Sequence, residues 1–139
     1  MTEPPVPDML VTRHLRVGFV ALAIFIVLGV VLEGFHAVKA PFYLDAGNEG
    51  TRLLLRLSHA HGTLLSLVNV VYAVAMKARP RLAHALPSNA LLVALVLLPA
   101  GFLLGGAFAR SADPGVGILL VPLGAVSLLV FAFSAARRA

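Results

Sequence analysis

Residues 57–76 read LSHAHGTLLSLVNVVYAVAM, an uncharged stretch that is about 30 Å long when it is folded as an α-helix. This length matches the hydrocarbon thickness of a bilayer, so the stretch predicts a transmembrane helix. The stretch nevertheless contains His59, His61, Asn69 and Tyr72. Polar and ionisable side chains are costly inside a bilayer, which makes these residues the first candidates for a functional site.

Three further apolar blocks surround this stretch in a chain of 139 residues. The chain is 60% hydrophobic and 12% charged, with a mean hydropathy of +0.97. We therefore predict an all-α, integral membrane four-helix transmembrane bundle that forms a single domain over residues 15–139, after a disordered cytoplasmic tail of residues 1–14. The four predicted spans cover residues 15–38, 52–76, 89–109 and 116–136.

Composition also excludes several functional classes. The chain has no cysteine, so thiolate ligands, iron–sulfur clusters and disulfides are excluded. It contains no Walker loop, no GxSxG or HExxH motif and no dinucleotide-binding fingerprint. The net charge of +5 arises from basic residues near the ends of the predicted helices. We therefore predict no nucleic-acid partner, and we expect these charges to set the membrane topology.

The distribution of lysine and arginine predicts the orientation. Seven lie in the N-terminal tail, the second loop and the C-terminus, and four lie in or beside the first and third loops. The seven are Arg13, Arg16, Lys77, Arg79, Arg81, Arg137 and Arg138, and the four are Lys39, Arg52, Arg56 and Arg110. We therefore predict a multi-pass protein of the inner or plasma membrane with both termini cytoplasmic. The intramembrane polar groups then gather in the outer third of the bundle.

The two histidines of the second span differ in their surroundings. They are two residues apart, so they point about 200° apart on a helix. The neighbours of His61 on its face are bulky, whereas His59 shares its face with small residues, namely Gly62, Thr63 and Ser66. Such a face leaves room for a flat ligand such as haem, and imidazole is a normal haem ligand. His59 is therefore the favoured axial ligand, and His61 is the alternative.

Each of these residues also has a structural interpretation. The small face of His59 is equally suited to packing against another helix, with the histidine hydrogen-bonded across the contact. Asn69 is suited either to orienting a substrate oxygen or to bonding a neighbouring backbone group. Glu33 and His36 are expected either to support the metal ligand as a pair or to form a proton path. The alternative is that both reach water at the helix end.

Other polar and small residues have simpler expected roles. His14 and His84 lie in basic segments and are expected to be solvated. Gly101 and Gly105 form a small-xxx-small pair, which is typical of close contacts between helices. Thr51 is the expected N-cap of the second span.

The segment RLSHAHG, residues 56–62, resembles the entry to the second helix in the styrene oxide isomerase family. The four-span layout, Glu49-Gly50 before this segment, Asn69 after it and Gly101-Phe102 in the third span also resemble that family. Such proteins are small four-helix membrane proteins that form trimers and bind haem b between protomers. The resemblance thus implies a haem b site with a histidine ligand, in a homo-oligomer that is a trimer.

The same resemblance implies an isomerase in which ferric iron acts as a Lewis acid on a small apolar epoxide. Asn69 would then be the catalytic asparagine, although the asparagine of the family lies nearer its histidine. The tyrosine and aspartate of the family are replaced by Leu103 and Leu95. The alternatives are a non-enzymatic haem protein for electron transfer or gas sensing, and a bundle without cofactor that has a structural or partner-binding role. Membrane lipids are expected partners in every case.

Overall fold

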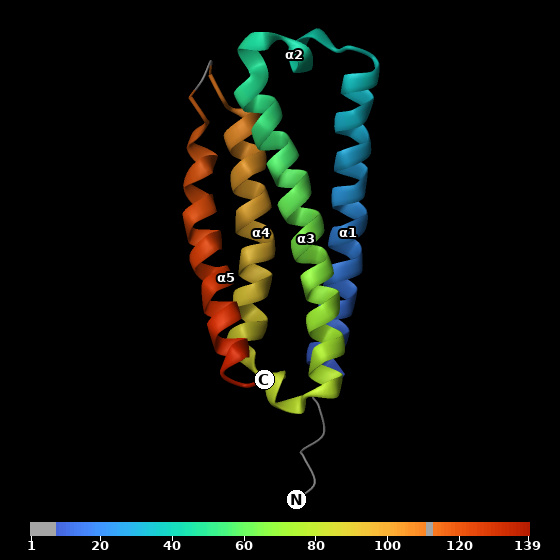
Figure 1. Ribbon diagram of the computed structural model, residues 1–139, viewed down its shortest axis with the longest axis vertical. Coiled ribbons are helices and arrows are strands. Elements are labelled where there is room, and N and C mark those ends of the chain that lie inside the picture. The colour runs from blue at the N-terminus through green and yellow to red at the C-terminus, as the bar shows by residue number, and fades with distance from the viewer. Residues whose placement is uncertain (1–7, 111–112) are drawn as a thin grey trace, which may run out of the picture.

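The structure is a computed structural model that describes residues 8–110 and 113–139, and four long helices dominate it. These are α1 (Asp8–Ala37), α3 (Glu49–Ala78), α4 (Ala85–Ala107) and α5 (Leu120–Ala136). They run up and down beside one another, and the start of α1 and the end of α5 lie at the same end of the molecule (Figure 1). All four helices are long and apolar enough to cross a membrane, as predicted.

Short helical segments connect the long helices. The α1–α3 connection contains α2 (Pro41–Leu44) and the 3₁₀ helix η1 (Ala46–Asn48), and the 3₁₀ helix η2 (Pro80–Leu82) joins α3 to α4. A third 3₁₀ helix, η3 (Val116–Leu119), leads directly into α5.

Three of the long helices begin earlier than the predicted spans. α1 begins at Asp8, so the expectation of a disordered tail is wrong for residues 8–14, and residues 1–7 lie outside the described part of the chain. α3 begins at Glu49 with Asn48 as N-cap residue, so Thr51 lies inside the helix and is not its cap. α4 starts at Ala85 because the imidazole of His84 accepts a hydrogen bond from the backbone N–H of Leu86 at 3.2 Å and caps the helix.

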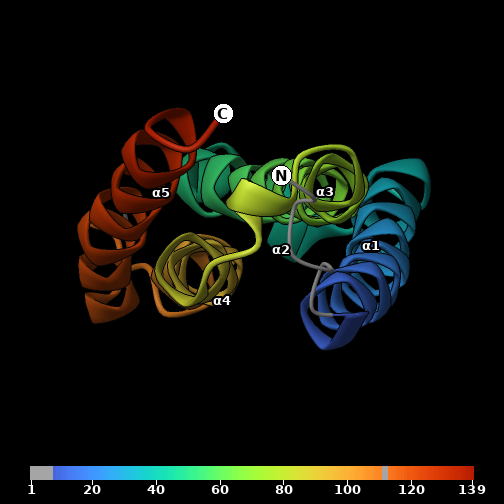
Figure 2. The same cartoon turned by 90° about the horizontal axis from the view of Figure 1, so that it is seen from below.

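The four long helices are arranged as a row in the order α1, α3, α4, α5. Extensive packing joins α1 to α3, α3 to α4 and α4 to α5. The view along the bundle shows α1 and α5 on opposite sides, with α3 and α4 between them (Figure 2). The two outer helices expose many large apolar side chains, among them Phe19, Val27, Leu123 and Phe133. An apolar surface of this extent suits a lipid environment.

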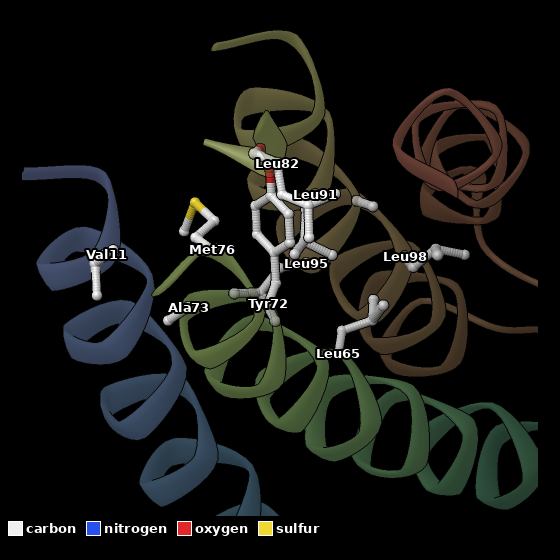
Figure 3. Packing of buried hydrophobic residues seen from close by; sticks show 10 residues of the cluster. Val11, Leu65, Tyr72, Ala73, Met76, Leu82, Leu91, Leu95 and Leu98 are labelled. Atoms are coloured by element: carbon white, nitrogen blue, oxygen red, sulfur yellow. Dashed lines mark hydrogen bonds between the residues drawn. The ribbon is translucent and has the colours of Figure 1, made fainter. Parts of the chain in front are cut away.

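The largest buried apolar cluster joins α3 to α4 at the end of the molecule where α1 begins. Tyr72 of α3 lies beside Leu91 and Leu95 of α4 in this cluster, and Ala73 and Met76 lie on the side of α3 towards Val11 of α1 (Figure 3). The side chain of Leu82 covers the cluster from η2. This core fixes the C-terminal half of α3 against α4.

Glycines allow α4 and α5 to approach closely. A Cβ atom placed on Gly101 would lie 2.8 Å from Cγ2 of Val121 and 2.9 Å from its backbone nitrogen. A Cβ atom on Gly105 would lie 3.3 Å from Cδ1 of Ile118. The prediction that Gly101 and Gly105 make helix contacts is confirmed, and their neighbour in the structure is α5 and the segment that precedes it.

Candidate functional site

His59 lies between α3 and α1, in the half of the molecule opposite the chain termini. Its Nδ1 atom is 2.7 Å from the backbone carbonyl oxygen of Phe25 on α1. A carbonyl oxygen only accepts hydrogen bonds, so Nδ1 carries the proton and donates it. In the neutral form of the ring, Nε2 carries the free lone pair, and it has no hydrogen-bond partner among the described residues.

Gly29 makes this position of the imidazole possible. A Cβ atom on Gly29 would lie 2.8 Å from Nδ1 of His59 and closer still to its Cε1, which leaves no room for any other residue type without movement of the ring. Gly29 follows Phe25 by four residues, so the carbonyl group of Phe25 points along the helix towards Gly29. The missing side chain therefore exposes the second lone pair of that carbonyl oxygen to the imidazole.

A surface cavity of about 400 Å³ lies beside the ring of His59. Most of its wall is apolar, and two charged side chains line it together with the histidine. The lining residues are Ile26, Gly29, Val30, Leu32, Glu33, Arg56 and His59. The cavity therefore presents one imidazole, one guanidinium and one carboxylate on an otherwise apolar surface formed by α1 and α3.

Glu33 and His36 lie near this cavity but are both exposed. Nδ1 of His36 lies 3.4 Å from the guanidinium of Arg56, across the gap between α1 and α3. Glu33 makes no hydrogen bond or ion pair with another described residue. The two residues thus share the cavity region with His59, and only Glu33 lines the cavity itself.

His61 points to a different helix, as its spacing from His59 predicts. Its Nδ1 atom donates to the carbonyl oxygen of Leu57 in the preceding turn at 2.9 Å, and its ring lies 4.8 Å from the ring of Phe102 on α4. The two histidines therefore contact opposite neighbours of α3, and only His59 lines the surface cavity beside α1.

The small residues beside His59 pack against α1. A Cβ atom on Gly62 would overlap the ring of Phe25, so that ring fills the space beside the glycine. Ser66 is buried and donates to the carbonyl oxygen of Gly62 at 2.7 Å, while Thr63 is half-buried with its hydroxyl oxygen unpaired. The expected room for a flat ligand on this face is absent, because the small side chains allow close helix packing there.

Asn69 belongs to a second polar cluster, which lies at the other end of α3. Its Nδ2 atom donates to the carbonyl oxygen of Leu65 at 2.8 Å, so its Oδ1 atom faces Nδ1 of His14 at 2.6 Å. Asn69 thus bonds a neighbouring backbone group, which was one of its two expected roles. Ten residues separate it from His59, about 15 Å along the helix axis, so it does not lie beside that histidine.

His14 is fully buried in this cluster, so the expectation that it is solvated is wrong. Its Nδ1 atom donates to Asn69, and its Nε2 atom is 2.6 Å from the hydroxyl of Ser88 on α4. That hydroxyl also accepts from the guanidinium of Arg13 at 2.5 Å. The ring of Tyr72 lies edge-on to His14 at 5.0 Å, so apolar and polar contacts together enclose the imidazole.

The hydrogen bonds of this cluster form one directed chain. Arg13 donates to Ser88, whose hydroxyl proton is then directed to Nε2 of the neutral His14, and His14 donates to Asn69. Tyr72 donates separately to the carbonyl oxygen of Leu82 at 2.6 Å. With both ring nitrogens engaged, this histidine has no lone pair for a ligand, and the cluster ties α1 to α3 and α4.

A metal site built from protein side chains alone is not found in the described part of the chain, which has no group of three or more His, Asp or Glu side chains placed to hold a metal ion. Comparisons with family models, with curated proteins and with solved structures gave no match. The chemistry of the site therefore has to be inferred from its own residues.

Proposed function

We propose that this chain is an integral membrane four-helix bundle that binds haem b beside α1 and α3, where His59 would hold the iron. The observation that carries the proposal is the hydrogen bond from Nδ1 of His59 to the carbonyl oxygen of Phe25. Histidines that ligate metals commonly donate their other ring N–H to a backbone carbonyl, which fixes the tautomer and the orientation of the ring. Nε2 of His59 is the free nitrogen that such a site requires.

The other groups at the cavity fit a haem in chemical type. The apolar wall suits the macrocycle, and the Arg56 guanidinium is suited to a charge-assisted hydrogen bond with a propionate. The chain has no cysteine that competes for the iron. Bound ferric haem would supply a Lewis acid at this position. The cavity is at the surface, so we propose that a second copy of the chain covers the cofactor, as the trimers of styrene oxide isomerases imply.

Haem binding has more support than epoxide isomerisation. Asn69, the proposed catalytic residue, is held by His14 and by the carbonyl oxygen of Leu65, away from His59. Its arrangement supports a structural role at the opposite end of the bundle. An isomerase would need another polar group at this cavity, and Glu33 and Arg56 line it together with His59. Turnover of a small apolar epoxide by the purified protein tests this activity directly.

The visible spectrum of the purified protein tests haem binding. After expression with ample haem, we expect a Soret band from the wild-type protein and its loss or shift in His59→Ala. His61→Ala is the matched control, because its ring faces Phe102 on α4, and it should keep the band. A colourless wild-type protein would eliminate the haem proposal. Loss of the band in His61→Ala alone would make His61 the ligand and reject His59.

A second candidate function is a bundle without cofactor, in which His59 serves helix packing. The packing of Phe25 against Gly62 favours it, because the same contact positions the histidine against α1. Haem binding requires an Nε2 atom of His59 that has no hydrogen-bond partner, whereas helix packing has no such requirement. Exogenous imidazole distinguishes them, since it should restore a Soret band to haem-supplied His59→Ala only if the lost group was a ligand.

We further propose that both termini face the cytoplasm. The start of α1, the α3–α4 connection and the end of α5 lie at one end of the molecule, and seven of the basic residues belong to these segments or the residues beside them (Figure 1). A reporter that is active only in the cytoplasm should give signal after Ala139 and none within residues 45–50. The reverse pattern would place the His59 cavity in the inner half of the membrane.

A further inference from the structure

A second cavity lies between α1 and α4, which are both packed against α3 and are not adjacent to each other in the row. Its volume is about 670 Å³, and its wall is formed by apolar side chains of both helices. Ser58 of α3 also lines it, but this residue is buried and its hydroxyl donates to the carbonyl oxygen of Pro99 at 2.9 Å. Because this hydroxyl is satisfied within the protein, the cavity offers a ligand an apolar surface along its length.

The cavity follows α1 from Arg16 to Leu28. Twelve residues of helix rise about 18 Å, which is close to one leaflet of a hydrocarbon core about 30 Å thick. The cavity is therefore a long apolar groove whose length matches that of an extended acyl chain in one leaflet.

Arg16 is the charged residue at one end of this cavity. Its side chain is exposed and makes no hydrogen bond or ion pair with another described residue. The neighbouring Arg13, in contrast, is engaged with Ser88 and Asn89. A free guanidinium at the end of an apolar groove complements an anionic group attached to a hydrocarbon chain.

We propose that this groove binds one acyl chain of an anionic phospholipid, with the phosphate of the lipid at Arg16. The inference rests on the membrane placement in the proposed function and is independent of haem. No residue lines both the groove and the His59 cavity, which extends along α1 from Ile26 to Glu33. The two ligands therefore do not compete for space.

Native mass spectrometry of the full chain, reconstituted with equal amounts of phosphatidylglycerol and phosphatidylcholine, tests the proposal. We expect one retained phosphatidylglycerol per chain, favoured about fivefold over phosphatidylcholine, because one arginine near an anionic surface contributes about that factor. Arg16→Gln should retain a lipid without this preference. Equal retention of the two lipids by the wild-type protein would overturn the assignment of Arg16.

Variants that fill the groove test its position. Ala100→Phe from α4 and Ala21→Phe from α1 should each lose the retained lipid, because both alanines line the groove. Ala125→Phe is the matched control, since Ala125 is exposed on α5 outside the groove. Undiminished lipid in both groove variants would overturn the proposal, provided that their helical content matches that of Ala125→Phe.

Two further outcomes distinguish a lipid in the groove from a second copy of the chain and from haem binding. If Ala100→Phe reduces the oligomer size and leaves lipid retention unchanged, a second copy of the chain occupies the groove and the lipid proposal is wrong. A colourless wild-type protein that retains phosphatidylglycerol would reject haem binding and support the groove. Recovery of the chain in the soluble fraction would overturn both proposals together.

Discussion

Replacement of Gly29 by alanine tests how the imidazole of His59 is held against α1. The new Cβ atom would lie 2.8 Å from Nδ1 of the ring and closer still to Cε1, so the ring has to turn away from Phe25. The lost hydrogen bond contributes about 0.5–1.5 kcal/mol. Displacement of the side chain from its rotamer costs about as much again. We therefore expect Gly29→Ala to lower the free energy of unfolding by about 1–3 kcal/mol, before any gain in helix propensity.

Gly34 provides the matched control on the same helix. A Cβ atom there meets nothing within 4 Å, so Gly34→Ala should show only the gain in helix propensity, about 0.8–1 kcal/mol. The difference between the two variants then isolates the effect on His59. Unfolding in mixed detergent micelles, followed by circular dichroism, measures both stabilities. Equal stability of Gly29→Ala and Gly34→Ala would refute the contact between Gly29 and His59.

Two other changes test the remaining contacts. Gly101→Ala should lower the free energy of unfolding by about 1–3 kcal/mol, because the added Cβ meets backbone as well as side-chain atoms of Val121. Gly34→Ala again serves as control. Unchanged stability of Gly101→Ala would reject the α4–α5 contact. A double-mutant cycle of His14→Ala and Ser88→Ala should give a coupling free energy of about 0.5–3 kcal/mol in the same unfolding assay, because the two side chains are directly hydrogen-bonded. Strictly additive effects would show that this hydrogen bond contributes nothing.

The helices were predictable from sequence because each is a long apolar block. The start of α1 was not, because Arg13, His14 and Arg16 are typical of a solvated collar before a membrane helix. His14 is turned inward by a contact with Ser88, which lies 74 residues later in the chain. No local pattern reports such a distant partner, although the inward-facing positions of Asn69 and Tyr72 on α3 indicate that polar groups are buried there.

The opposite directions of His59 and His61 were predictable, because helical geometry fixes them. The residues that contact each imidazole ring were not predictable, because they depend on how α1 and α4 are placed along α3. The small residues next to His59 indicated a close contact, and a helix and a flat ligand are equally consistent with such residues. Only the position of Phe25 shows that the helix fills this space.

Contacts between helices that are not adjacent in the row occur at one end of the described bundle only. Near the chain termini, His14 of α1 reaches Ser88 of α4, and the ring of Tyr72 on α3 meets that of Phe131 on α5 at 5.1 Å. At the opposite end, the described residues show no such hydrogen bond or ring contact between helices that are not neighbours in the row. Local opening is favoured where fewer contacts have to break. The helices should therefore separate more readily at the end that is far from the chain termini. Amide hydrogen exchange should be fastest there, at the end of α1, the start of α3, the end of α4 and the start of α5.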